Sequence, residues 1–183
     1  FAMSLDGKIA TRAGDSKWIS STQARQLAHE LRAEVDAVMI GIGTALADNP
    51  QLTVRDAKVK GPQPTRVVVD SSARLPWDAA MLSEDGDTIV AMVNGAERRV
   101  AALERAGAEM LTMSGNGEVV DLRKLLSSLG ERDITSVLVE GGSQLLGSLF
   151  DLGLVDKVIA IVAPVVIGGD DSNTNGALLA EYF

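Results

Sequence analysis

Short apolar runs alternate with helical patterns along most of the chain. Five runs typical of buried strands lie at 37–42, 65–69, 88–93, 109–113 and 137–139. Four segments with apolar residues at helical spacing lie at 20–34, 96–106, 121–129 and 145–150. A longer apolar run at 157–167 predicts a further strand, and Pro164 within it favours a position near a sheet edge. The alternation predicts an α/β fold: a mostly parallel central sheet with helices on both faces.

The stretch from Val137 to Leu149 combines a strand, a glycine turn and a helix. Glu140 ends the apolar run, and Gly141 and Gly142 follow at once. Two adjacent glycines allow positive φ and close approach of a ligand, and the N–H groups of a following helix suit a phosphate. We expect Glu140 at the carboxyl end of a central strand, where open α/β sheets bind ligands. A glycine turn alone often serves only packing. A charged residue in an apolar turn costs free energy, however, so its presence favours a functional role.

Two other turns follow predicted strands, at 41–48 and at 70–74. The first contains Gly-x-Gly-Thr, which is too short for the dinucleotide fingerprint. Signatures of a Walker A loop, a serine-hydrolase elbow and a zinc site are absent from the sequence. Arg25, His29 and Arg32 share one face of the first predicted helix, which is either solvated or directed at a ligand. These patterns indicate several anion-binding turns without fixing a reaction.

Composition excludes several classes of protein. With 183 residues and 46% hydrophobic residues, the chain can form one domain with a sizeable core. It has no cysteine and only one histidine, so we expect no metal site, and its net charge of −8 argues against a nucleic-acid partner. No apolar run approaches the roughly 20 residues of a membrane helix, and no signal peptide is visible, so we expect a cytoplasmic protein without a membrane anchor. The sequence begins at Phe1 without an initiator methionine and stops at Phe183 without a closing element. We interpret 1–183 as a single domain trimmed at both ends.

Seven ordered blocks carry a family resemblance across essentially the whole chain. They are Ala2-Met-Ser-Leu-Asp-Gly-Lys-Ile-Ala10, Ser16-Lys-Trp-Ile19, Leu31-Arg-Ala33, Gly41-Ile-Gly-Thr-Ala-Leu-Ala-Asp-Asn-Pro50, Leu52-Thr-Val-Arg55, Val69-Asp-Ser71 and Val139-Glu-Gly-Gly142. Together they resemble the reductase domain of the bacterial riboflavin-biosynthesis deaminase–reductase. The resemblance implies a dihydrofolate-reductase-like fold and NADPH-dependent reduction of 5-amino-6-(5-phosphoribosylamino)uracil to its ribitylamino product. It also implies that the deaminase domain is not part of this chain.

The resemblance implies two sets of ligand residues. Cofactor contacts are expected from Ala2, Trp18, Thr44, Asp48, Ser71, Gly142, Ser143, Gln144, Leu145, Leu146, Gly147 and Ser148. Substrate contacts are expected from Ser16, Arg32, Leu52, Arg55 and Glu140.

The residue types support these sets and add one member. Arg74 follows Ser71 beyond a strand end, and we expect both to hold a ribose 2′-phosphate, although a solvated loop arginine is an equal alternative. Arg32 and Arg55 match the substrate phosphate, because a guanidinium binds phosphate oxygens bidentately. Thr44 is a candidate both for the cofactor and for the N-cap of its helix.

For catalysis we expect a carboxyl group to assist opening of the ribosyl ring or to stabilise the iminium. Glu140 is the first candidate and Asp48 the second. Three alternatives stay open: a related diaminopyrimidine substrate, a dihydropterin substrate, and a domain that binds dinucleotide without turnover. The two arginines favour a phosphorylated substrate over a dihydropterin. We also expect a homodimer, with the apolar segment 154–167 as a candidate interface.

Overall fold

The computed structural model describes residues 2–8, 22–55, 61–113 and 118–168. The chain divides into two compact units, which are described separately. The sheet unit is His29–Gly142, and the terminal unit combines Phe1–Ala28 with Ser143–Phe183.

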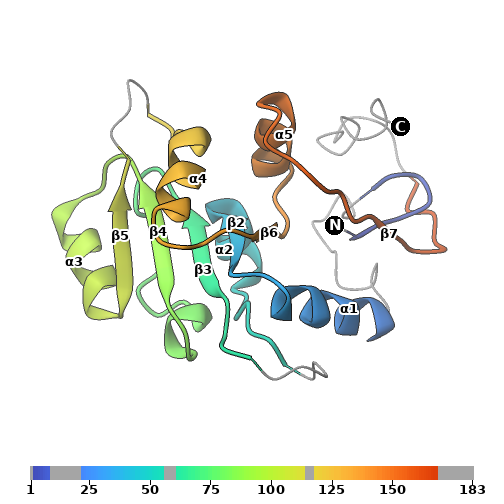
Figure 1. Cartoon of the computed structure of the whole chain (residues 1–183), viewed down its shortest axis with the longest axis horizontal. Helices are drawn as coiled ribbons and strands as arrows, with labels where there is room; N and C mark the ends of the chain where they lie inside the picture. The colour runs from blue at the N-terminus through green and yellow to red at the C-terminus, as the bar shows by residue number, and fades with distance from the viewer. Residues whose placement is uncertain (1, 9–21, 56–60, 114–117, 169–183) are drawn as a thin grey trace. The chain divides into compact units, whose positions relative to one another are not determined.

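The sheet unit contains five parallel strands (Figure 1). In chain order they are β2 (Ala37–Gly41), β3 (Thr65–Val69), β4 (Thr88–Met92), β5 (Ala108–Thr112) and β6 (Val137–Val139). Their spatial order is β5-β4-β3-β2-β6, with every neighbouring pair parallel. The predicted parallel α/β sheet is therefore confirmed, and the boundaries of all five strands lie within one residue of those predicted.

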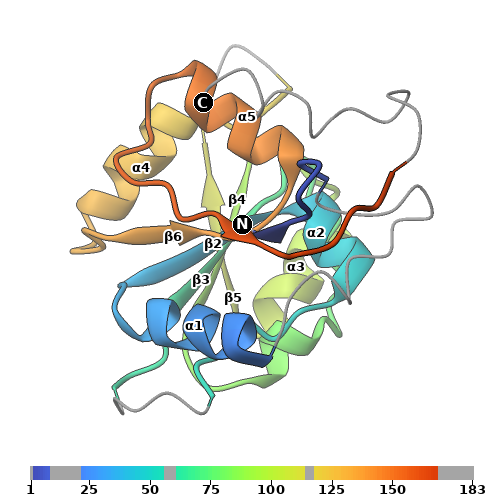
Figure 2. The ribbon, with the colours of Figure 1, turned by 90° about the vertical axis from the view of Figure 1, so that its right-hand side faces the viewer.

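Helices cover both faces of this sheet. On one face Val38, Ile40, Val68 and Val90 form a cluster with apolar residues of the covering elements. Those elements are α2 (Ile42–Asp48), the 3-10 turn η1 (Ala80–Ser83) and α3 (Glu97–Arg105), and the opposite face is covered by α4 (Leu122–Gly130) (Figures 1 and 2). The buried residues of α4 are Leu122, Leu125 and Leu129, which recur at the spacing of one helix face. Burial on both faces explains why the central strands are almost entirely apolar.

Asp36 anchors the start of β6 beside the start of β2. Its Oδ2 accepts hydrogen bonds from the backbone N–H and the hydroxyl of both Thr135 and Ser136, at 2.8 to 2.9 Å. These bonds favour the charged carboxylate and lower the pKa of Asp36 from 3.8 to about 2. At the other end of β6, the Glu140 N–H donates to the Met39 carbonyl at 2.9 Å. A strand of three residues is thus fixed in register at both ends.

The position of β6 corrects one prediction. Within the described sheet, β6 pairs with β2 at the edge, not in the centre as expected, and its three residues are half-buried. A run of only three apolar residues is compatible with either position, so the sequence pattern did not distinguish them.

In the terminal unit, β1 (Ala2–Met3) pairs in parallel with β7 (Ile161–Val162), and α5 spans Ser143–Asp151. The prediction of a long strand over 157–167 is wrong, since only two of its residues form a strand. Pro164 has no N–H to donate and follows the strand closely. Asp6 instead fixes this segment by accepting the N–H groups of Ile167 and Gly168, at 3.1 and 2.9 Å. The Ser4 hydroxyl, which donates to Asp6 at 2.6 Å, and these two N–H groups together lower the pKa of the Asp6 carboxyl group.

The helix α1 (Thr22–Ala33) begins in the terminal unit and ends in the sheet unit. No helix in the described parts of the chain is long and apolar enough to cross a membrane.

Candidate functional site

The strand order creates a switch point between β2 and β6. The chain passes from β2 through β3 and β4 to β5 in one direction, and then returns to place β6 on the other side of β2. Ligands of open α/β sheets bind beside such a point, at the carboxyl ends of the strands. In this sheet, the residues at that point are the start of α2 after β2 and the turn Glu140–Gly142 after β6.

Glycine is required in the turn after β6 by its backbone conformation. Gly141 and Gly142 have φ angles of +74° and +85°, which other residues rarely adopt. A β carbon at Gly141 would lie 3.5 Å from Cγ2 and Oγ1 of Thr44, so these two residues face each other across the switch point. Thr44 is not the N-cap of α2, because the helix already begins at Ile42 and its cap is Gly41.

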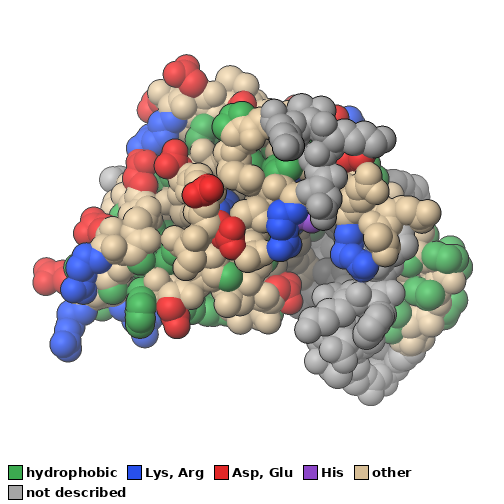
Figure 3. All heavy atoms as spheres, turned by 90° about the horizontal axis from the view of Figure 1, so that it is seen from below, with side chains coloured by type: hydrophobic (Ala, Val, Ile, Leu, Met, Phe, Trp, Pro, Cys, Tyr) green, Lys and Arg blue, Asp and Glu red, His purple; other side chains and the backbone are tan. Residues whose placement is uncertain are grey.

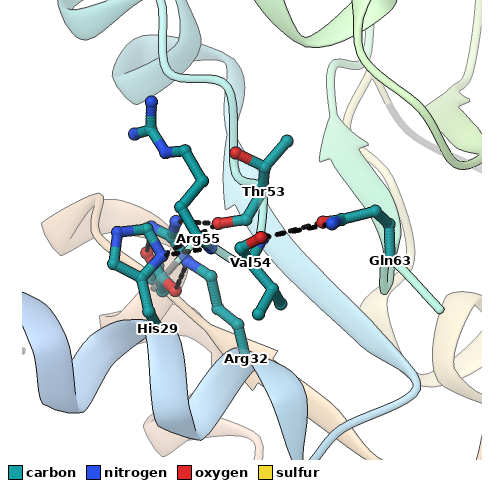
Figure 4. Close-up of polar contacts among 7 residues, drawn as sticks. His29, Arg32, Thr53, Val54, Arg55 and Gln63 are labelled. Carbon is teal, nitrogen blue, oxygen red and sulfur yellow. Dashed lines mark hydrogen bonds and ion pairs between the residues drawn. The ribbon is translucent and has the colours of Figure 1, made fainter. Parts of the chain in front are cut away.

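Arg32, in the last turn of α1, holds the carboxylate of Glu140. Its Nε–H donates to Oε1 and its Nη2–H to Oε2, each at 2.6 Å, which is a bidentate ion pair. The side chains are only 13% and 24% exposed. The Nη1–H of Arg32 also donates to the Thr53 carbonyl at 2.9 Å (Figure 4). Arg32 therefore joins three segments: the end of α1, the Leu52–Arg55 segment and the turn after β6.

The Leu52–Arg55 segment has no regular secondary structure, and side chains from elsewhere satisfy its backbone. The Gln63 amide accepts from the Val54 N–H at 2.7 Å and donates to the Val54 carbonyl at 3.2 Å (Figure 4). The Arg55 N–H donates to His29 Nδ1 at 3.2 Å. Leu52 lies in the core with a φ of +55°, an unfavourable conformation for a side chain of this size.

The Arg55 guanidinium points away from Arg32 (Figure 4). Its Nη1–H donates to Gln51 Oε1 at 2.5 Å, and Arg55 as a whole is exposed. The two arginines expected to share one phosphate therefore have different roles in this structure. Arg32 is engaged with protein groups, whereas Arg55 is directed toward solvent.

Asp48 is exposed at the last residue of α2. The C-cap is the next residue, Asn49, with a φ of +42°, and its N–H donates to the Ala45 carbonyl. Within the residues that the structure describes, the Asp48 carboxylate forms no hydrogen bond. The helix therefore ends at Asp48, and the Asp48 side chain does not stabilise that end.

The turn after β3 is held by the fully buried Asp70, whose Oδ2 accepts from the N–H groups of Arg74 and Leu75. Ser71 is half-buried and its hydroxyl accepts from the Val120 N–H at 3.2 Å. The Arg74 side chain is 51% exposed, with its Nε 3.4 Å from Asp70 Oδ1. The turn thus presents a serine hydroxyl and a half-exposed guanidinium, a donor set that fits an anion.

The other predicted ligand residues belong to the terminal unit or lie outside the described residues. Ala2 lies in β1, and Ser143, Gln144, Leu145, Leu146, Gly147 and Ser148 lie in α5, both in the terminal unit. Leu145 is buried, and the Ser148 hydroxyl donates to the Gln144 carbonyl at 2.9 Å. Ser16 and Trp18 lie outside the described residues.

Two residues that hold the Leu52–Arg55 segment, His29 and Gln63, were not among the predicted ligands. His29 shares a helix face with Arg32 in the sequence, which is a usable signal, but Gln63 carries none. Over the β5–α3 side of the sheet unit, acidic and basic side chains are interspersed (Figure 3). The described residues contain no group of three or more carboxylate or histidine side chains suited to a metal ion.

Comparisons with known proteins show the family of the chain. A family model described as "RibD C-terminal domain" matches residues 1–178. A Methanothermobacter thermautotrophicus protein named 2,5-diamino-6-ribosylamino-4(3H)-pyrimidinone 5′-phosphate reductase is 43% identical over 174 residues, covering 94% of this chain and 79% of the relative. The riboflavin biosynthesis protein RibD of Actinobacillus pleuropneumoniae is 38% identical over 95% of this chain and 46% of the relative.

Two solved structures superpose on this chain and have the same fold. RibD of Acinetobacter baumannii superposes with a TM-score of 0.79 at 35% identity, covering 92% of this chain and 46% of that one. The Saccharomyces cerevisiae reductase Rib7 superposes with a TM-score of 0.71 at 23% identity, which shows a common fold. The chain spans about half the length of the RibD relatives and about four-fifths of the archaeal one.

Proposed function

Because the chain belongs to the RibD C-terminal domain family, we propose that it is the NADPH-dependent reductase of 5-amino-6-(5-phosphoribosylamino)uracil in riboflavin biosynthesis. The observation that carries this proposal is the Arg32–Glu140 ion pair beside the glycine turn at the switch point. It places a fixed carboxylate where an open α/β sheet binds its ligands. When bound, NADPH supplies the hydride.

Glu140 acts on the sugar. Ring opening breaks the C1′–O4′ bond and transfers the N–H proton to O4′, which leaves a C1′=N group. A proton from solvent converts this group to the iminium, and hydride addition at C1′ completes the ribityl chain. Paired with Arg32, Glu140 presents negative charge, so we assign it to stabilising the positively charged iminium. Asp48, exposed at the end of α2, is the second candidate.

Arg55 binds the 5′-phosphate. It is exposed, and Gln51 takes only one of its N–H groups, which leaves guanidinium donors for phosphate oxygens. Arg32 orients Glu140 and retains two N–H groups that form no hydrogen bond to described residues, one on each terminal nitrogen. Ser16 and Leu52 complete the proposed substrate contacts.

The nicotinamide dinucleotide is proposed to be NADPH because of the turn after β3. Ser71 and Arg74 supply a hydroxyl and a guanidinium suited to a 2′-phosphate. Thr44 and the glycine turn supply a hydroxyl and backbone N–H groups beside the switch point. The remaining cofactor residues of the proposal are Ala2, Trp18, Asp48 and the residues from Ser143 to Ser148.

A second candidate substrate is the 2,5-diaminopyrimidinone. It is supported by the archaeal relative, which is named for that substrate and of which this chain covers 79%. We also propose that the protein is cytoplasmic and forms a homodimer. The homodimer is supported by the exposed valines of the predicted interface segment, at positions 158, 162, 165 and 166.

The deciding experiment follows NADPH oxidation with each pyrimidine and identifies the ribityl product by mass. Turnover of the uracil supports the first proposal, and turnover of only the diaminopyrimidinone supports the second. Dinucleotide binding with neither substrate reduced would favour a non-catalytic binding domain. A Glu140→Gln protein that still folds and still binds NADPH is the matched control.

A further inference from the structure

The Leu52–Arg55 segment is held by side chains, and one of them, His29, has no role in the reaction described above. His29 Nδ1 lies 3.0 Å from the Thr53 carbonyl and 3.2 Å from the Arg55 backbone nitrogen (Figure 4). His29 and Arg32 are three residues apart on α1, so both approach the segment from the same helix face.

The direction of the hydrogen bond between His29 and Arg55 follows from the groups involved. The Thr53 carbonyl already accepts from Arg32 Nη1 at 2.9 Å. The Arg55 N–H can only donate, and His29 Nδ1 is its acceptor among the described residues. With Nδ1 unprotonated, the Arg55 N–H has its acceptor in His29 and the Thr53 carbonyl has its donor in Arg32. His29 therefore sets the direction of the Arg55 backbone.

The other residues of the segment are held by contacts that do not involve His29, so the His29 contact acts on Arg55 in particular. Val54, the preceding residue, is fixed by two hydrogen bonds to Gln63, and Leu52 is fixed in the core with a positive φ. Arg55 comes last in this braced segment, and its side chain is directed to solvent by its backbone and by Gln51. Loss of the His29 contact therefore frees the residue whose guanidinium is proposed to bind the phosphate.

We propose that His29 is a positioning residue for phosphate recognition: its Nδ1 fixes the Arg55 backbone so that the guanidinium is preorganised for the substrate phosphate. This inference rests on the proposed function. It gives the two polar side chains of α1 different roles: Arg32 orients Glu140, and His29 orients Arg55. His29 touches neither the reacting atoms nor the phosphate.

The test compares His29→Leu with His29→Asn. Asparagine can place Oδ1 near the position of Nδ1, since both atoms are three bonds from Cα, whereas leucine has similar bulk and no acceptor. With the phosphorylated substrate, His29→Leu should raise KM about fivefold at nearly constant kcat, the effect of one hydrogen bond to a neutral group. With the dephosphorylated substrate, KM should not change, and His29→Asn should restore KM to within about twofold of wild type.

A double variant tests whether the effect passes through Arg55. Arg55→Ala should raise KM for the phosphorylated substrate by about tenfold or more, and adding His29→Leu should raise it no further. Equal KM increases for both substrates, independent effects in the double variant, or an Asn variant as impaired as the Leu variant would each overturn the proposal.

Amide hydrogen exchange separates this inference from the proposed function. The Arg55 amide should exchange faster in His29→Leu than in wild type, and His29→Asn should restore its protection. If wild type reduces neither pyrimidine, the proposed function fails while the exchange comparison still decides whether His29 holds Arg55. Unchanged exchange in a folded His29→Leu protein would refute the positioning role.

Discussion

Removal of Arg32 should measure how strongly the ion pair supports the site. Arg32→Ala deletes two N–H···O bonds of 2.6 Å to Glu140 and one of 2.9 Å to Thr53. It leaves a carboxylate that is only 24% exposed without its cation. Exposed pairs are worth about 0–1 kcal/mol, and breaking a buried pair costs about 3–5 kcal/mol. Because a little water reaches this pair, we expect a loss of about 2–3 kcal/mol.

The assay is thermal unfolding of wild type, Arg32→Ala, Glu140→Ala and the double variant. For a chain of this size, the expected loss lowers Tm by roughly 5–10 °C. The double variant should be more stable than the sum of the single losses predicts, by about 1.5–2.5 kcal/mol. Arg32→Lys keeps the charge but lacks the planar fork, so its Tm should fall between those of wild type and Arg32→Ala. Additive losses, or a Tm of Arg32→Ala within about 1 °C of wild type, would refute the coupling.

Three further predictions concern turnover, cofactor choice and acid stability. Glu140→Gln should lower the single-turnover rate of NADPH oxidation by about 100-fold and leave NADPH affinity unchanged; near-normal turnover would move the catalytic assignment to Asp48. NADPH should bind at least about 10-fold more tightly than NADH, and Ser71→Ala and Arg74→Ala should each narrow that ratio in a titration; equal affinities in wild type would contradict the assignment. The folded-state pKa of Asp36 is lowered from 3.8 to about 2, so its stabilising contribution is present above pH 4 and is lost as pH falls toward 2. Asp36→Asn should therefore flatten the decline of wild-type stability over that range in acid-denaturation curves, and an unchanged decline would argue against this role.

The strands of the sheet unit were predictable because each is a short apolar run closed by turn residues. Thr65–Val69 and Val137–Val139 were predicted with the boundaries that the structure shows. The family resemblance is also confirmed, because it depends on ordered blocks along the whole chain. The long strand at 157–167 was predicted from hydropathy, and Pro164 was interpreted only as a sign of an edge position, although its missing N–H also limits the length of the strand.

The site was only partly predictable, because its contacts join distant residues. Arg32 and Glu140 were both selected from the sequence, but they are 108 positions apart, and no spacing rule indicates that they pair. The Arg32 side chain was therefore assigned to phosphate, although the structure engages it with a carboxylate. The Gln63 contact with Val54 and the positive φ of Leu52 are likewise products of tertiary packing.

The strand order has a consequence for synthesis of the chain on the ribosome. Ala37 of β2 pairs with Val137 of β6, so about 100 residues emerge between the two strands. Until β6 arrives, β2 presents an open row of N–H and C=O groups beside side chains that are fully buried in the finished sheet. Such an edge is a template for pairing with another chain, and distant pairings form slowly. Nascent chains that end before β6 should consequently aggregate. They also lack Glu140, whose carboxylate pairs with Arg32 in the finished fold.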